Sequence, residues 1–157
     1  MLWKTKKKPL FDNKVVGVKK SPDLKEKLDK EFSLFIRFRD SEKFDFRYFR
    51  CISCGQIKPF EQADCGHYFS RSNLSTRFDE DNCHSECRSC NCYDSAHLEG
   101  YKRNLISKIG KDRFDALGLK IAEEKRCPSD FKIDDSEYKK RIAHYKSLNS
   151  KFKIWKC

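Results

Sequence analysis

Two pairs of cysteines have the spacing of a metal site. Each pair, Cys51–Cys54 and Cys87–Cys90, encloses two residues, so that one tight turn can direct both sulfur atoms at the same ion. Gly55 follows the first pair and has the conformational freedom that such a turn often needs. Four thiolates complete a tetrahedral shell without an open position, which is typical of a structural zinc site. The spacing therefore predicts one structural Zn²⁺ held by both pairs.

The remaining cysteines lack this paired spacing. Nine cysteines in 157 residues are too few for a disulfide scaffold, and their clustering favours metal binding in a reducing compartment. Cys65, His67, Cys83 and His84 lie near the pairs but are left out of the zinc set because they are not paired. The cysteines outside the pairs are expected to be small buried side chains or inert thiols: Cys65, Cys83, Cys92, Cys127 and Cys157.

One histidine and two asparagines occur in an order that could support phosphodiester hydrolysis. His67 lies between the cysteine pairs, and a neutral imidazole can accept a proton from water at cytosolic pH. Asn91 directly follows the second pair and offers an amide oxygen to a hard divalent cation, which would stabilise phosphate charge. Asn82 could bind backbone and hold the His67 strand in place. This order is found in HNH nucleases with a ββα-metal core, whereas the simpler alternative is a hydrogen-bonded histidine without a catalytic role.

The charge distribution favours nucleic acid as the partner. The net charge is +11, and the excess of Lys and Arg lies in residues 1–20 and 101–157, whereas residues 21–100 are slightly acidic. Arginines also alternate with aromatic residues in 44–50, and the alternative is a solvated basic surface. No apolar run is long enough to span a membrane and no secretory signal is visible, so a soluble, cytoplasmic protein without a membrane partner is expected.

Helical periodicity surrounds the cysteine-rich segment. Apolar residues recur at three- or four-residue spacing in 24–38, 98–109, 114–121 and 138–152. The first helix is expected to start at Ser21-Pro22 and the last near Asp135. Gly110 is expected to end the helix in 98–109. His97 and His144 are expected to be surface or packing residues without partners.

These elements predict an α+β fold with a small zinc-stabilised ββα-metal core, of the HNH, treble-clef-like kind, flanked by helices. The chain is expected to divide into a basic arm (1–20), an N-terminal helix and link (21–50), a zinc-bound HNH-like core (51–100) and a basic helical C-terminal region (101–157).

A family resemblance makes the expected function specific. It rests on these residues: Cys51-Ile52-Ser53-Cys54-Gly55, Gly66-His67-Tyr68, Arg77-Phe78, Asn82, His84, Cys87, Cys90-Asn91 and Leu105-Ile106-Ser107 with Ile109-Gly110. With them, a little over half of the chain resembles the NinG (Rap) family of lambdoid phage recombination proteins. The resemblance implies a metal-dependent, structure-specific DNA endonuclease that acts on D-loops and Holliday junctions during homologous recombination in the bacterial host.

The resemblance also implies roles for single residues. His67 becomes the general base, Asn91 a ligand of a catalytic Mg²⁺ or Mn²⁺, Asn82 the structural amide, and His84 a supporting residue of the active site. Many HNH sites carry an Asp or His ligand directly before the base, but this chain has Gly66 there. Asp64 is the nearest carboxylate and is expected to supply that ligand.

Two other functions compete with the nuclease. The first is a non-catalytic zinc module that binds branched or single-stranded DNA and recruits other recombination proteins. The second is a zinc-dependent protein-interaction domain, which leaves the basic flanks and both asparagines unexplained. Branched DNA is the expected partner, and symmetric cutting of a junction would favour a homodimer.

Overall fold

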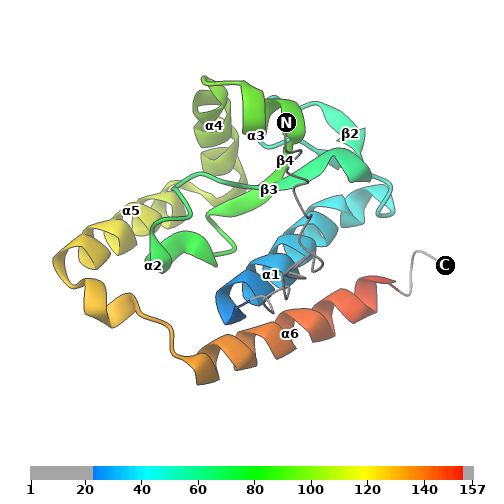
Figure 1. Ribbon diagram of the computed structural model, residues 1–157. Helices are drawn as coiled ribbons and strands as arrows, with labels where there is room; N and C mark the ends of the chain where they lie inside the picture. Colours follow the sequence, from blue (N-terminus) through cyan, green and yellow to red (C-terminus); the bar gives the residue numbers. More distant parts are fainter. Residues whose placement is uncertain (1–22, 154–157) are drawn as a thin grey trace, which may run out of the picture.

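Two short antiparallel hairpins lie among six α-helices in the computed structural model, which describes residues 23–153 (Figure 1). In the first hairpin, β1 (Tyr48–Arg50) pairs with β2 (Ile57–Pro59). In the second, β3 (Ala63–His67) pairs with β4 (Cys83–Cys87). The mixed α+β class that the sequence predicts is confirmed. The basic arm, Ser21-Pro22 and Cys157 lie outside the described residues.

The four long helices lie close to the predicted positions, and two short ones, α2 (Leu74–Arg77) and α3 (Arg88–Tyr93), were not predicted. The long helices are α1 (Leu24–Ser41), α4 (His97–Ile109), α5 (Lys111–Arg126) and α6 (Asp135–Lys153), with 3-10 turns η1 (Glu42–Phe44), η2 (Phe60–Gln62) and η3 (Pro128–Phe131). Gly110 ends α4 with a positive φ of 86°, a conformation that favours glycine. The predicted end of this helix is therefore confirmed.

The start of α1 differs from the prediction. The described helix begins at Leu24 and is capped by Asp23, whose carboxylate accepts a hydrogen bond of 2.7 Å from the Glu26 amide. An ionised side chain at this position satisfies a free amide and also complements the positive end of the helix dipole.

An aromatic core joins α1 to α6, which lie side by side in Figure 1. The Phe32 and Tyr145 rings meet edge to face at 5.1 Å, and Phe35 lies 5.2 Å from the same tyrosine ring. Leu28 and Ile36 are completely buried in the same cluster. Burial of these side chains holds the two long helices together across the sequence.

The β3–β4 hairpin lies between α1 and α4. Successive residues of a strand point to opposite faces, so Cys65 and His67 share the face toward α1 with Cys83, which pairs with His67. Cys65 and Cys83 belong to the α1–α6 core. On the other face, the Tyr101 hydroxyl of α4 lies 3.0 Å from the Gly66 carbonyl oxygen. We call these the α1 face and the α4 face of the hairpin.

Candidate functional site

The four paired cysteines meet in one cluster at the end of the hairpin. Their sulfur atoms all lie within 4.8 Å of one another. Cys51 and Cys54 come from the turn after β1, Cys87 ends β4, and Cys90 lies in α3. Gly55 has a φ of 72°, which allows the chain to turn tightly after the first pair. This donor set could hold a metal ion, and four thiolates suit zinc.

The protonation of these thiols depends on a cation. Burial raises the pKa of the Cys51 thiol to about 11, although hydrogen bonds from backbone amides oppose this shift. Burial, with a hydrogen bond to Cys87, raises the pKa of the Cys90 thiol further. Burial alone would raise the pKa of the Cys54 thiol too, but hydrogen bonds from the Gln56 amide and the neighbouring cysteines lower it. The neutral thiol is therefore favoured at Cys51 and Cys90, and a bound divalent cation would favour the thiolate form there.

Asp64 and Asn91 lie together beside this cluster. The Asn91 Nδ2 atom of α3 is 3.5 Å from the Asp64 Oδ2 atom of β3, and Arg88 approaches the other carboxylate oxygen at 3.3 Å. The Asp64 side chain is 24% exposed, so a cation could reach it from solvent. The structure thus joins two of the expected ligands of a hard divalent ion.

Asn82 joins the two ends of the loop that connects β3 to β4. Its Oδ1 atom accepts a hydrogen bond of 2.8 Å from the Phe69 amide. Its Nδ2 atom donates to the carbonyl oxygens of Phe69 and Thr76, both at 3.0 Å. The side chain is completely buried, so these bonds are shielded from water and hold the loop close to His67.

His67 lies on the α1 face, away from Asp64 and Asn91. Its Nδ1 atom is 3.2 Å from the Cys65 carbonyl oxygen, and its Nε2 atom is 3.0 Å from the Arg77 carbonyl oxygen. Burial is the main cause that lowers the pKa of this imidazole below its ordinary value. Among residues 23–153, no hydrogen bond joins His67 to Asp64, Asn82, His84 or Asn91. The structure therefore gathers Asp64 and Asn91 but holds the expected base apart from them.

His84 lies in a buried cluster of charges on the α4 face. Arg39 Nη2 and Lys108 Nζ approach its Nδ1 atom at 2.8 and 3.0 Å, so this nitrogen accepts and the imidazole is neutral. Burial, with the charges of Lys108 and Arg39, lowers the pKa of His84, although Asp40 opposes the shift. The His84 Nε2 atom is buried and has no partner among the described residues.

Asp40 compensates the two cations of this cluster. Its Oδ1 atom accepts from Lys108 at 2.8 Å, and its Oδ2 atom accepts from the Ser85 amide at 2.7 Å. Burial alone would raise the pKa of Asp40, but the Arg39 and Lys108 cations hold it well below its usual range. The cluster therefore carries two positive charges against one negative charge.

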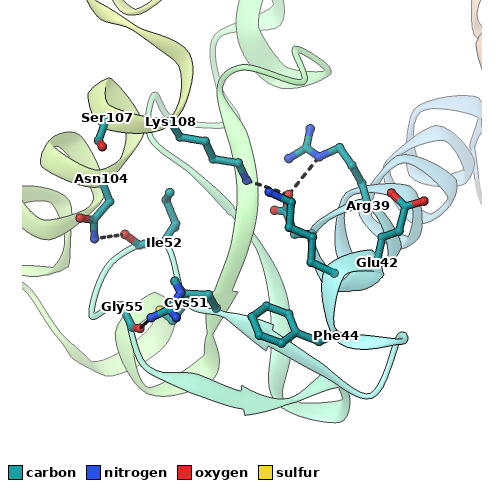
Figure 2. Close-up of a pocket in the computed structure, with 12 residues that line it drawn as sticks. Arg39, Glu42, Phe44, Cys51, Ile52, Gly55, Asn104, Ser107 and Lys108 are labelled. Atoms are coloured by element: carbon teal, nitrogen blue, oxygen red, sulfur yellow. Dashed lines mark hydrogen bonds and ion pairs between the residues drawn. The ribbon is translucent and has the colours of Figure 1, made fainter.

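A cleft of about 620 Å³ opens beside these charges. Figure 2 shows Arg39 and Lys108 approaching each other from α1 and α4, with Gly55 and Cys51 of the four-cysteine cluster at another wall. Lys43 and Arg50 also line the cleft, and neither forms an ion pair within residues 23–153. The lining includes four cations and two carboxylates, so the cleft suits an anion.

Gly66 leaves room for a buried carboxylate. A Cβ atom at position 66 would lie 2.8 Å from the Cβ atom of Glu86, which is completely buried on the α4 face. Glu86 Oε1 is 2.7 Å from His97 Nδ1 and also accepts from the Ser53 hydroxyl, whereas Oε2 has no partner among the described residues. The expectation that His97 has no partner is wrong, because the start of α4 directs this side chain at Glu86.

The unpaired cysteines also differ from the expectation. Cys83 is buried, but Cys92 and Cys127 are exposed. Cys65 and Cys83 join His67 in a second cluster, whose ligand atoms all lie within 4.8 Å of one another. Paired spacing alone missed this cluster, and the signal that could have found it is the C-x-H spacing of a strand that puts both side chains on one face.

The fold and the clusters define a small α+β protein with a four-cysteine metal centre. Comparison with known proteins assigns the family: residues 4–152 match the family model described as bacteriophage lambda NinG protein. The chain is 32% identical over 117 residues to protein ninG of Escherichia phage lambda and 32% identical over 117 residues to protein ninG of Salmonella phage P22. Over 84 residues it is 38% identical to protein ninG of Enterobacteria phage H19B. The chain belongs to the NinG family, as the resemblance predicts.

The chain spans about half the length of the first two of these relatives. The alignment to the lambda and P22 proteins covers 74% of this chain and 54% of each relative, and the alignment to the H19B protein covers 53% and 38%. No solved structure matches the chain. None of the helices in residues 23–153 is long and apolar enough to cross a membrane.

Proposed function

We propose that this NinG-family chain is a metal-dependent endonuclease that cuts branched DNA, such as D-loops and Holliday junctions, in phage recombination. In this account zinc in the four-cysteine cluster would hold an HNH-type core together, and Asp64 and Asn91 would hold a separate Mg²⁺ or Mn²⁺. His67 would accept a proton from the attacking water, and the divalent ion would supply charge that stabilises the departing 3′ oxygen. The products carry 5′-phosphate ends.

The proposal is carried by the meeting of Asp64 and Asn91 beside the cysteine cluster, where Asn91 Nδ2 lies 3.5 Å from Asp64 Oδ2. A half-turn of the amide group would bring its oxygen to this position. A carboxylate and an amide oxygen are hard ligands that suit Mg²⁺, and Asp64 can stand in for the ligand that Gly66 lacks. His67 follows Asp64 by three residues on the same strand. Asn82 would act as the structural amide, because its bonds fix the loop that begins after His67.

The basic cleft supports DNA as the substrate. Lys43 and Arg50 are exposed at the cleft, and Arg39 and Lys108 add charge at its base. A DNA backbone phosphate in this cleft would release counterions and hold one strand beside the hairpin. His84 would support the site by accepting hydrogen bonds from Arg39 and Lys108 and so fixing both cations in place.

A second function is favoured by one observation. Both ring nitrogens of His67 face backbone carbonyl oxygens, and the ring lies on the opposite face from Asp64. A ring held in this way suits a zinc module that binds branched DNA without cutting it and recruits other recombination proteins.

Nicking of a labelled four-way junction separates the two functions. The full chain is incubated with the junction or with a linear duplex of the same sequence, in Mg²⁺, in Mn²⁺ and in EDTA, and binding is measured in parallel. The nuclease proposal expects nicks with 5′-phosphate ends in the junction with either ion, fewer nicks in the duplex and none in EDTA. Tight junction binding without nicks in either ion would contradict the nuclease and favour the binding module.

A further inference from the structure

The α1 face of the hairpin gathers three soft metal ligands. Cys65, His67 and Cys83 each offer one donor atom, and these atoms lie within 4.8 Å of one another. The strand pairing explains their meeting, because His67 is opposite Cys83 and Cys65 is two residues earlier on the same strand. Two thiols and one imidazole are ligands that zinc prefers, and three protein ligands leave a fourth position for water.

The surroundings of His67 offer two acceptors, whereas a neutral ring has one donor. A neutral imidazole has one N–H group, but both ring nitrogens of His67 face carbonyl oxygens, at 3.2 and 3.0 Å. One nitrogen therefore directs a lone pair at an oxygen atom, which is an unfavourable contact. Metal-bound histidines usually donate their other N–H to a backbone carbonyl oxygen, and either carbonyl could serve here.

The thiol of Cys83 lies at the same place. Its Sγ atom is 3.7 Å from the Arg77 carbonyl oxygen, the same oxygen that His67 Nε2 faces. Cys83 is completely buried and Cys65 is half-buried, so the ligands are shielded by α1 and the aromatic core. A cation bound there would be protected from bulk water, unlike one bound at Asp64.

We propose that Cys65, His67 and Cys83 form a second zinc site, and that zinc bound there inhibits the nuclease. Binding would release the two thiol protons to solvent and join the ion to both sulfur atoms and one ring nitrogen. A nitrogen that is bound to zinc cannot accept a proton from water, so the occupied site withdraws His67 from catalysis. The zinc site stands on the geometry alone, and only the inhibition rests on the proposed nuclease function.

Metal counting on purified full-length protein tests the site without any activity. The variants are Cys65→Ala, the isosteric Cys65→Ser in case the first folds poorly, and the control Cys92→Ala, which removes an exposed cysteine of α3. Parent and Cys92→Ala should bind two zinc ions per chain, one in each cluster, and the Cys65 variants one. With cobalt in place of zinc, the thiolate-to-metal absorption should fall in the Cys65 variants. One zinc per chain in the parent, or equal counts in the parent and a folded Cys65 variant, would overturn the site.

Nicking assays then test the inhibition. Added zinc should slow junction nicking by the parent and by Cys92→Ala, and should have less effect on the Cys65 variants. Two zinc ions per chain with nicking that is insensitive to zinc would overturn the inhibitory role. If no protein nicks DNA, the nuclease proposal and the inhibition fail together, while the metal count still decides whether the second site exists.

Discussion

The two faces of the β3–β4 hairpin come from the same strands but carry different chemistry. The α1 face holds Cys65, His67 and Cys83 against an aromatic core, and these are soft ligands without a neighbouring carboxylate in their cluster. The α4 face carries Asp64 and Glu86, two hard carboxylates. Strand alternation alone therefore separates soft ligands from hard ones within one small hairpin.

In the proposed nuclease, this separation would let different neighbours control proton transfer and ion binding. His67 is fixed by backbone carbonyls and packed beside α1, whereas Asp64 and Asn91 are held by the start of α3. Changes on one face should therefore leave the other largely intact. The four-cysteine cluster is the exception to this independence. It lies where β4 leads into α3, so a change there should affect the residues on both faces of the hairpin.

The largest effect should come from breaking that cluster. Cys87→Ser removes the ligand that ends β4, and structural zinc contributes about 10 kcal/mol to small metal-bound folds. This equals or exceeds the free energy of unfolding of many whole domains, so we expect the β3–β4 hairpin to unfold and the residues on both of its faces to lose their positions. Thermal melting should show no cooperative transition. Zinc counting should show that the ion of the four-cysteine cluster is lost. The control is Cys127→Ser, an exposed cysteine after α5, which should melt like the parent. A Cys87→Ser protein that keeps its zinc and its melting temperature would contradict the ligand assignment.

A smaller effect should follow from changing the charge network around His84 on the α4 face. Asp40→Asn leaves Arg39, Lys108 and His84 without their carboxylate. Loss of one partner from a buried ion pair costs about 3 kcal/mol, and because the Lys108 side chain is 45% exposed we expect about 2 kcal/mol here. Denaturant unfolding at neutral pH should show this loss. Asp115→Asn, in an exposed pair with Lys111, should change the free energy of unfolding by less than about 0.5 kcal/mol. Equal effects of the two substitutions would contradict a buried network.

The same carboxylate should make stability depend on pH. The pKa of Asp40 is lower in the folded state than in the unfolded state, so its contribution is complete above about pH 5 and is lost as pH falls toward the folded pKa. The free energy difference between parent and Asp40→Asn should therefore shrink below pH 5. Release of zinc at low pH should affect the parent and Asp40→Asn alike, so the difference between their free energies of unfolding reports on Asp40 alone. A constant difference down to pH 3 would contradict the shift.

The smallest effect should be on DNA affinity. Lys43→Ala with Arg50→Ala removes two exposed cations of the cleft, so junction binding should weaken about equally for all sequences. The slope of log affinity against log salt should fall by about 1 for each lost phosphate contact. Lys139→Ala, an exposed lysine of α6, is the control. An unchanged slope in the double variant would place the DNA elsewhere.

Local patterns predicted much of this molecule. The C-x-x-C pairs predicted the four-cysteine cluster, because two residues between ligands fix their geometry through one turn. Apolar periodicity and Gly110 predicted the helices from α4 to α6. These features depend on residues that are close in the sequence, so the sequence contains the information directly.

Long-range contacts were not predictable in this way. The meeting of Cys65 and Cys83 in one cluster depends on the register of two strands that a 15-residue connection separates. The contact of His97 with Glu86 depends on how α4 returns to the hairpin, and a buried Glu cannot be distinguished from a surface Glu by its neighbours in the sequence. Which face His67 occupies follows from the same register, and no local spacing specifies it.

The most direct test of the nuclease account compares two variants from opposite faces as the Mg²⁺ concentration is varied. His67→Ala should lower the rate of junction nicking about 100-fold or more at every Mg²⁺ concentration, since no ion replaces a missing proton acceptor. Asn91→Ala should also nick slowly, but higher Mg²⁺ should restore part of its rate by mass action. Both should bind the junction like the parent, and His144→Ala, an exposed histidine of α6, should nick normally. If His67→Ala nicks junctions as fast as the parent, the proposed mechanism is wrong.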